Sequence, residues 1–366
     1  MIYSIFPTQT AWISSGSNLV TGVTEKDQNF GKDEILELKK FYYNNSLNHY
    51  TRVLVSFAGT DFTNLSASVA AGTIPSNASY YLKLYEAEGN SDLSEEYTLA
   101  VLPISESWDE GVGRFGDSPK VTNGVSWKYR SNKTGASAVT WSNAGVTTLV
   151  VSSSLQTFSK QVPDVDIDVT NMTNMWYKNE AGNYGLLLRF SGSQETDETT
   201  FGHLNFFSSN TNTIYAPKLE VRWDDSSFDS DTTGSLISLD VTGSVDNYLY
   251  MKGLKESYKE GDRVKFRVGA RKRYIQKTFN TSVQTVTGSY IPAGSGSYAI
   301  KDVATDEFII PFSAYTTMSC DTTSNYFTQW LDGFYPDRVY KIIYKLKYDD
   351  GQEQIFDNNF EFKVKR

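Results

Sequence analysis

Short segments with strand-like patterns of apolar residues dominate the chain. In YYLKLYEA (80–87), Leu82 and Leu84 fall on one face of an extended segment, and Lys83 and Tyr85 fall on the other. Similar segments, rich in β-branched and aromatic residues and bounded by turn-forming residues, recur along the chain. They are 51–57, 96–104, 146–154, 183–190, 217–223, 236–241, 248–251, 263–270, 307–312, 339–348 and 359–366. The sequence therefore predicts an all-β fold.

The best helix candidate is NMTNMWYKNE (171–180), in which Met172, Met175 and Trp176 recur at helical spacing. Thr170 or Asn171 supplies an N-cap. Few other segments show helical spacing, so we expect a short helix that plugs one end of a β-sandwich and leaves the all-β class unchanged.

An acidic, Ser/Thr/Gly-rich run at 224–235 interrupts the apolar pattern and reads as a linker between domains. We predict a jelly-roll β-sandwich over 1–224, a linker over 225–235 and a smaller immunoglobulin-like β-sandwich over 236–366. The last segment has about the length of an immunoglobulin-like sandwich. Such a domain lacks the usual disulfide here, because Cys320 is the single cysteine of the chain.

Composition narrows the classes of function. The 366 residues carry a net charge of -9, which argues against a general nucleic-acid-binding role and leaves room only for a local basic surface. One cysteine and two histidines, His49 and His203, do not supply the ligands of a zinc site, and we expect no metal or cofactor. The first residues lack the pattern of a signal peptide, and no apolar run of about 18 residues indicates a membrane span.

Seven pieces of the first domain, in order, resemble the DNRLRE family, the disaggregatase-related jelly-roll domain of cell-surface and carbohydrate-associated proteins. They begin with NFGKDEILEL at Asn29, TRVLVSF at Thr51 and IPSNASYYLKLY at Ile74. SWDEG at Ser107 and VSWKY at Val125 come next. The last two are VDIDVTNMTNMWYKNEAGNYGLLL (165–188) and FFSSNTNTIYAPKLEV (206–221).

The second domain resembles an immunoglobulin-like region found in virion proteins of tailed bacteriophages. The resemblance is carried by YMKGLKESYKEGDRVKFRVGARKRY (250–274), YAIKDVATDEFIIPFSAYTTMSCDTTSNYF (298–327) and GFYPDRVYKIIYKLKY (333–348). This resemblance implies a non-enzymatic tail or neck protein of a phage. The crAss-like phages of the gut are the suggested lineage. The expected localisation is the virion, assembled in the host cytoplasm, and the expected partners are further copies in a ring and other tail, neck or portal-proximal proteins.

ISESWDEGVGRFG (104–116) raises the question of catalysis. Asp109 and Glu110 are adjacent, so in an extended segment they point to opposite faces, and in a turn both tend outward. Glycosidases need two carboxylates about 5–10 Å apart that face one sugar. We therefore expect Trp108, Asp109, Glu110 and Gly111 to form a structural turn whose tryptophan packs on the core, with a bound ion as the smaller alternative.

Three further features carry weaker candidate chemistry. The DVDID run (164–168) evokes a calcium loop but lacks the glycine and glutamate that such a loop requires. Cys320 is expected to be a buried small hydrophobe. Neither histidine has a nucleophile at a recognisable spacing, so no enzyme is predicted, and a glycoside hydrolase or lyase is only a minor third hypothesis.

The strongly basic stretch is KGLKESYKEGDRVKFRVGARKRYIQK (252–277), in which cationic residues alternate with apolar ones. It predicts one cationic strand face, either solvated or docked on an acidic protein subunit, with DNA as a lesser possibility. The interface candidates are Lys265, Arg267, Arg271, Lys272 and Arg273.

Tyrosines at strand spacing, such as Tyr80, Tyr81 and Tyr85, or Tyr340, Tyr344 and Tyr348, are read first as core or interface residues. A sugar platform built from them is the alternative. The sequence therefore predicts a structural virion component, and a carbohydrate-binding adhesin that contacts host glycan remains the competing function.

Overall fold

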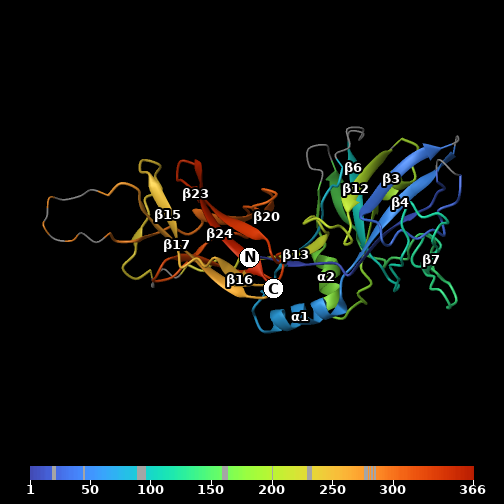
Figure 1. Ribbon diagram of the computed structural model, residues 1–366, viewed down its shortest axis with the longest axis horizontal. Helices are drawn as coiled ribbons and strands as arrows, with labels where there is room; N and C mark the ends of the chain where they lie inside the picture. Colours follow the sequence, from blue (N-terminus) through green and yellow to red (C-terminus); the bar gives the residue numbers. More distant parts are fainter. Residues whose placement is uncertain are drawn as a thin grey trace. The chain divides into compact units, whose positions relative to one another are not determined.

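The computed structural model describes all residues except 19–21, 44–45, 89–95, 159–163, 200, 229–232, 276–278, 280, 282 and 284–285. The chain divides into two compact units, Ser4–Val221 and Arg222–Arg366, and Met1–Tyr3 belong to the second (Figure 1). Each unit is described by itself.

The first unit contains a seven-stranded sheet and most of a four-stranded sheet, of which Ile2, Tyr3 and Arg222 fall within the second unit. Its elements are β1 (Ile2–Ile5), β2 (Gln9–Ser14), β3 (Ile35–Tyr43), β4 (Ser46–Ser56), α1 (Gly59–Ala70), β5 (Ser79–Leu84), β6 (Tyr97–Pro103), β7 (Tyr129–Ser131), β8 (Val139–Thr140), β9 (Ser154–Phe158), β10 (Val165–Asp168), α2 (Thr170–Tyr177), β11 (Leu186–Phe190), the 3-10 helix η1 (Gly192–Glu195), β12 (Gly202–Phe207) and β13 (Lys218–Arg222). The larger sheet has the order β12-β3-β4-β11-β6-β9, with β2 paired to β4, and the smaller has the order β1-β13-β5-β10. Strands β7 and β8 form a separate pair.

The central strands of the larger sheet are buried on both faces. Val53, Leu54 and Val55 of β4 are all inaccessible to solvent, which explains why this strand reads as a continuous apolar run. On one face, Leu54 and Leu187 pack in a cluster with Trp108 and residues up to Val146. The long connection between β6 and β9 thus covers this sheet, and each fully buried leucine contributes about 2–3 kcal/mol.

Helix α2 overlaps the predicted segment, and Met172 and Trp176 are buried. The predicted N-cap is wrong: Val169 is the N-cap and makes no side-chain cap hydrogen bond, whereas Thr170 is the first helical residue and its hydroxyl accepts from Tyr80 N at 2.9 Å.

Helix α1 was not predicted. It places Phe62 and Leu65 in the interior, and the Phe62 ring meets the Trp176 ring edge-on with centroids 5.2 Å apart. The two helices therefore pack against each other.

The predicted strand at 146–154 is wrong. Only Ser154 belongs to a strand, β9, and Thr148 makes an isolated bridge with Ile104. Val146 has a φ of 89°, a left-handed conformation that a β-branched residue rarely adopts and that interrupts extended structure.

The second unit is a sandwich of a six-stranded and a five-stranded sheet. Its strands are β14 (Ile237–Ser238), β15 (Asn247–Lys252), β16 (Ser257–Lys259), β17 (Arg263–Lys272), β18 (Ser289–Tyr290), β19 (Gly296–Asp302), β20 (Phe308–Ile310), β21 (Ser319–Cys320), β22 (Asn325–Trp330), β23 (Val339–Lys347) and β24 (Glu353–Lys365). The sheets have the orders β14-β18-β17-β22-β21, with β15 on β17, and β16-β24-β23-β19-β20.

The core of this unit is aromatic. Tyr298 of one sheet stacks on Phe327 of the other at 3.7 Å, and Phe266 meets Phe362 at 5.2 Å. The predicted all-β sandwich class is confirmed.

The division between the units differs from the predicted domain limits. Cys320 N donates to Ser227 O at 3.1 Å, and Phe228 forms a parallel bridge with Cys320. This part of the predicted linker extends the sheet edge at β21, whereas 229–232 lie outside the described residues. Ile2 also belongs to the core of the second unit, and its carbonyl accepts from Gln329 Nε2 at 2.8 Å.

Candidate functional site

The turn that follows β6 is held by its tryptophan. Trp108 is 6% exposed, packs in the cluster that covers the larger sheet, and donates its indole N–H to Tyr184 O at 2.9 Å. Asp109 makes an ion pair with Lys133 at 2.7 Å. Burial is the largest single effect and raises the pKa of Asp109. The hydrogen bonds from Lys133 and Ser131 lower it by more when taken together, so the net shift of the pKa is downward.

The expectation that both acids point outward is wrong for Glu110. Its side chain is 11% exposed and pairs with Lys32. Thr10 N donates to Glu110 Oε1 at 3.2 Å, and Asn210 Nδ2 lies 3.5 Å from the same oxygen. These partners come from segments far away in sequence, so adjacency to Asp109 did not reveal them. The carboxylate is engaged structurally and does not face a cleft together with Asp109.

Asn29, which sequence reasoning did not single out, connects the segments of this turn. It is fully buried, and its Nδ2 donates to Glu110 O at 2.7 Å and Val125 O at 2.8 Å. Its Oδ1 accepts from Gly113 N at 2.8 Å. Gly111 has a φ of 85°, and a Cβ there would lie 2.4 Å from Asn29 Oδ1. The glycine-rich sequence is therefore required for the backbone to approach the asparagine.

A carboxylate with a raised pKa lies beside this turn. Asp33 accepts from Trp12 Nε1 at 2.8 Å and from Phe115 N at 2.9 Å. Burial raises the pKa of Asp33 to about 6, although both hydrogen bonds oppose the shift. Trp12 in turn stacks on Phe30 with ring centroids 3.8 Å apart. The Asp33 carboxyl group therefore titrates next to the stacked rings of Trp12 and Phe30.

The described residues hold no group of three or more His, Cys, Asp or Glu side chains placed to bind a metal ion. On β10, Val165 and Ile167 point inward, and Asp166 and Asp168 are exposed. Cys320 is 2% exposed, and burial raises the pKa of its thiol to about 11, with a smaller effect from Asp321. The expectation of a buried small hydrophobe is confirmed.

The predicted basic strand is β17, and four of its five cationic residues share one face of the six-stranded sheet. Phe266, Val268 and Ala270 point into the core, whereas Arg263, Lys265, Arg267 and Arg271 alternate with them on the outside. Lys272 falls on the opposite side by strand periodicity and lies 3.7 Å from Asp240. Arg273 is exposed just past the strand end, and Lys277 lies outside the described residues.

Aromatic rings lie beside these cations. Arg263 sits over Trp330 at 5.0 Å, Lys265 over Tyr326 at 3.5 Å and Arg271 over Tyr248 at 4.7 Å, measured to the ring centroid. The rings come from β22 and β15, two of the strands that pair with β17. We call this surface the cation–aromatic face; it comprises Tyr248, Tyr250, Arg263, Lys265, Arg267, Arg271, Tyr326 and Trp330.

One carboxylate partly neutralises this face. Asp321 binds Arg267 through two hydrogen bonds of 2.9 and 2.8 Å and also pairs with Lys265 at 3.2 Å. The Arg267 hydrogen bond is the largest cause of a pKa well below the usual range for Asp321. Lys265 and Arg267 are therefore already paired within the chain, and Lys272 is a third predicted interface residue with a partner, Asp240. Sequence reasoning missed these pairs because both carboxylates are distant in sequence.

Four of the six tyrosines at strand spacing are too buried to form a sugar platform, and Tyr81 and Tyr85 are partly exposed. Tyr80, Tyr340 and Tyr344 are at most 2% exposed, and Tyr348 is 8% exposed. Burial raises the pKa of the Tyr344 phenol well above its ordinary value. Tyr85 is partly exposed, but Lys218 Nζ lies over its ring at 5.5 Å. The interpretation of these rings as core residues holds for the four buried ones.

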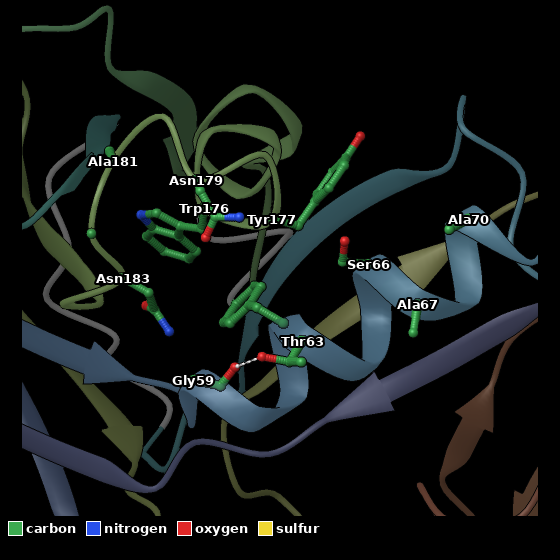
Figure 2. A pocket seen from close by; sticks show the side chains of 12 residues that line it. Gly59, Thr63, Ser66, Ala67, Ala70, Trp176, Tyr177, Asn179, Ala181 and Asn183 are labelled. Carbon is green, nitrogen blue, oxygen red and sulfur yellow. Dashed lines mark hydrogen bonds between the residues drawn. The ribbon is translucent and has the colours of Figure 1, made fainter.

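A pocket of about 460 Å³ lies between α1 and α2 in the first unit (Figure 2). Its lining carries no charged side chain and combines aromatic, hydroxyl, amide and small residues. The lining residues are Gly59, Phe62, Thr63, Ser66, Ala67, Ala70, Trp176, Tyr177, Asn179, Ala181, Gly182 and Asn183. Sequence reasoning missed this pocket because it missed α1, although the aromatic residues of α2 were recognised.

No helix in the described part of the chain is long and apolar enough to span a membrane. In comparisons with known proteins, no protein-family model matches this chain, and no curated protein matches it significantly.

Proposed function

We propose that the chain is a non-enzymatic structural protein of a tailed-phage virion, present in several copies as a ring or collar component of the tail or neck. The observation that carries the assembly part of this proposal is the cation–aromatic face of the second unit. The virion part is supported by the resemblance of 250–274, 298–327 and 333–348 to immunoglobulin-like regions of phage virion proteins.

The cation–aromatic face has the composition of a protein interface. Tyrosine, tryptophan and arginine are the residues that most often carry binding energy at interfaces. Each cation held over a ring gains about 0.5–1 kcal/mol at an exposed site and loses fewer rotamers on binding. The inner side of the same strands is anchored by Phe266 and Phe327, which are 2% exposed. The face is therefore rigid as well as chemically suited to binding.

The partner that we propose for this face is an acidic surface of a second copy. The chain carries a net charge of -9, so its remaining surface is acidic on average. Asp166 and Asp168 are exposed together on β10, an edge strand of the four-stranded sheet in the first unit. Pairing of two different surfaces is heterologous, and repetition around a closed rotation yields a ring.

Sedimentation velocity of the purified chain tests the assembly part. We expect oligomers at low salt that dissociate as salt is raised, because screening weakens contacts between charged faces. A double variant, Arg263→Glu with Arg271→Glu, should remain monomeric. The matched control, Lys347→Glu with Lys365→Glu, changes the net charge equally at exposed positions of the five-stranded sheet and should assemble more readily than the face variant.

Quantitative mass spectrometry of purified phage particles tests the virion part. The proposal requires the chain to be present in several copies per particle, in a stoichiometry that a ring can explain. Its absence from particles that are otherwise complete would reject the proposed virion role, whatever the oligomeric state of the isolated chain.

A further inference from the structure

The connection between β17 and β18 carries five large hydrophobic side chains that are exposed to solvent. Their exposed fractions run from 43% for Ile275 to full exposure for Phe279. The run 278–288 holds no charged residue. Single exposed hydrophobic residues are ordinary, but five of them between residues 274 and 286 indicate a surface that a partner covers. We call these residues the apolar arm; they are Tyr274, Ile275, Phe279, Val283 and Val286.

The pocket between α1 and α2 offers a matching surface on the first unit. All its lining residues are neutral, and Phe62, Trp176 and Tyr177 bring aromatic rings to it. Figure 2 shows Trp176 and Tyr177 on the α2 side, across from the residues of α1. Ala67 and Ala70 are exposed on the α1 side and present no bulky side chain to an incoming residue. The volume of about 460 Å³ leaves room for a phenylalanine ring.

Charged residues precede the neutral part on both surfaces. Arg271 and Arg273 lie at the end of β17, directly before the apolar arm. On the first unit, Asp166 and Asp168 come directly before α2, and Thr170 N donates to Asp168 Oδ1 at 2.8 Å. The eight residues of α2 are all neutral. The two surfaces therefore match cation with acid and neutral segment with neutral pocket, in the same order along the chain.

The apolar arm is long enough for this contact. Helix α2 has eight residues and is about 12 Å long at about 1.5 Å per residue, so the pocket lies about that far from Asp168. The chain from Arg273 to Phe279 spans up to about 20 Å, at about 3.3–3.6 Å per residue. Phe279 can therefore reach the pocket while Arg271 lies near the acidic edge of β10.

We propose that the apolar arm of one copy docks in the α1–α2 pocket of a second copy, with the Phe279 ring beside Tyr177. Aromatic rings gain from such contact through burial and ring packing. Because both surfaces are neutral, salt does not weaken this contact. The inference rests on the proposed assembly of several copies, and it identifies a second contact beside the cation–aromatic face.

Disulfide trapping between two differently tagged chains tests the contact. One chain carries Phe279→Cys and the other Ala67→Cys, so any mixed disulfide joins two copies. Cys320 is buried and its thiol pKa is raised to about 11, which keeps it unreactive. The control replaces Ala67→Cys by Asn64→Cys, an exposed α1 position that does not line the pocket. We expect about tenfold more mixed product than in this control, because a disulfide requires Cα atoms within about 7 Å.

Sedimentation of variants measures the same contact at equilibrium. Phe279→Ala removes a fully exposed side chain and therefore leaves the fold intact. It should raise the dissociation constant of self-association about tenfold, as expected for loss of an aromatic anchor. Val150→Ala removes another fully exposed side chain, in the first unit, and should leave the dissociation constant unchanged.

The outcomes separate this contact from the cation–aromatic contact. Mixed product no higher than in the Asn64→Cys control, or an unchanged dissociation constant in Phe279→Ala, would overturn the arm contact, and salt-sensitive oligomers of the wild type would still support the cation–aromatic contact. A disulfide that forms only when Phe279→Cys and Ala67→Cys are on one chain would also overturn it. A mixed disulfide whose yield does not fall in the Arg263→Glu with Arg271→Glu background would support the arm contact and reject the cation–aromatic contact.

Discussion

The turn at Trp108–Gly113 and the cation–aromatic face use polar and charged side chains in opposite ways. In the turn, the buried Asn29 binds several backbone groups, and the Glu110 carboxylate is held by Lys32 and Thr10 N. In the cation–aromatic face, Arg263 and Arg271 lie over rings on the outside of a sheet. Polar groups that bond one another inside a unit stabilise its fold, whereas outward cations beside aromatic rings are the groups that the proposed assembly uses.

The largest effect should come from Trp108→Ala. Loss of a buried tryptophan leaves a cavity under the connection between β6 and β9 and should lower the free energy of unfolding by about 3–5 kcal/mol. Urea unfolding checks this value. Phe115→Ala is the control, since Phe115 is 44% exposed, and its effect should be well below that of Trp108→Ala. Equal effects of the two variants would contradict the anchoring role of Trp108.

Asn29→Ala should have the next largest effect. It removes the hydrogen bonds to Glu110 O, Val125 O and Gly113 N, and the buried backbone groups left unpaired should cost about 2–4 kcal/mol of unfolding free energy. Asn123→Ala removes one exposed side-chain bond to Thr134 and should cost less than about 1 kcal/mol. A mild Asn29→Ala variant would show that the turn does not depend on this asparagine.

Asp33 makes the stability of the turn depend on pH. Its pKa in the folded chain is about 6, above the ordinary 3.8, so the folded state binds a proton more readily than the unfolded state between these values. The contribution of Asp33 therefore favours folding below about pH 4 and is lost as the pH rises through about 6. Other carboxylates, such as Asp321, have lowered pKa values and act in the opposite sense.

The comparison of wild type with Asp33→Asn isolates this contribution. We expect the wild type to lose about 1–2 kcal/mol of unfolding free energy relative to Asp33→Asn between about pH 4 and about pH 7. This change comes on top of a pH-independent cost in the variant, whose Nδ2 faces one of the two N–H donors that Asp33 accepts from. Urea unfolding at both pH values measures it. A difference that stays constant with pH would contradict the raised pKa.

The smallest effects distinguish the two acids of the turn. Asp109→Asn weakens an exposed ion pair with Lys133 and should change stability by less than about 0.5 kcal/mol. Glu110→Gln removes a charge that pairs with Lys32 in a partly buried site and should cost about 1–2 kcal/mol. Thermal unfolding of both variants ranks them, and the reverse order would show that Glu110 is not the structural acid.

Local sequence patterns predict which face of a strand a residue occupies, but they do not predict contacts between distant segments. The alternation along β17 predicts one cationic face, because strand periodicity alone decides which side each residue occupies. The pairing of that face with Asp321 depends on the turn after β21, which no local pattern reveals. Helix α2 is visible through Met172 and Trp176, whereas α1 is obscured because Thr63, Ser66 and Ser68 dilute its apolar stripe.

The same limit applies to the candidate sites. Trp108 could be recognised as an anchor from its place in a glycine-rich turn. The inward orientation of Glu110 could not be predicted from the sequence, because Lys32 and Thr10 approach it from distant segments. The pocket required both helices and was therefore invisible in the sequence, although Trp176 and Tyr177 are adjacent.

A charge-swap experiment tests the central claim most directly. Arg263→Glu with Arg271→Glu removes the cationic face, and Asp166→Lys with Asp168→Lys removes the acidic edge of β10. We predict that each double variant alone sediments with less self-association than the wild type. A chain that carries all four substitutions restores opposite charges between copies and should recover the salt-sensitive oligomers of the wild type. Failure of the fourfold variant to assemble, while the wild type assembles, would contradict pairing of these two surfaces.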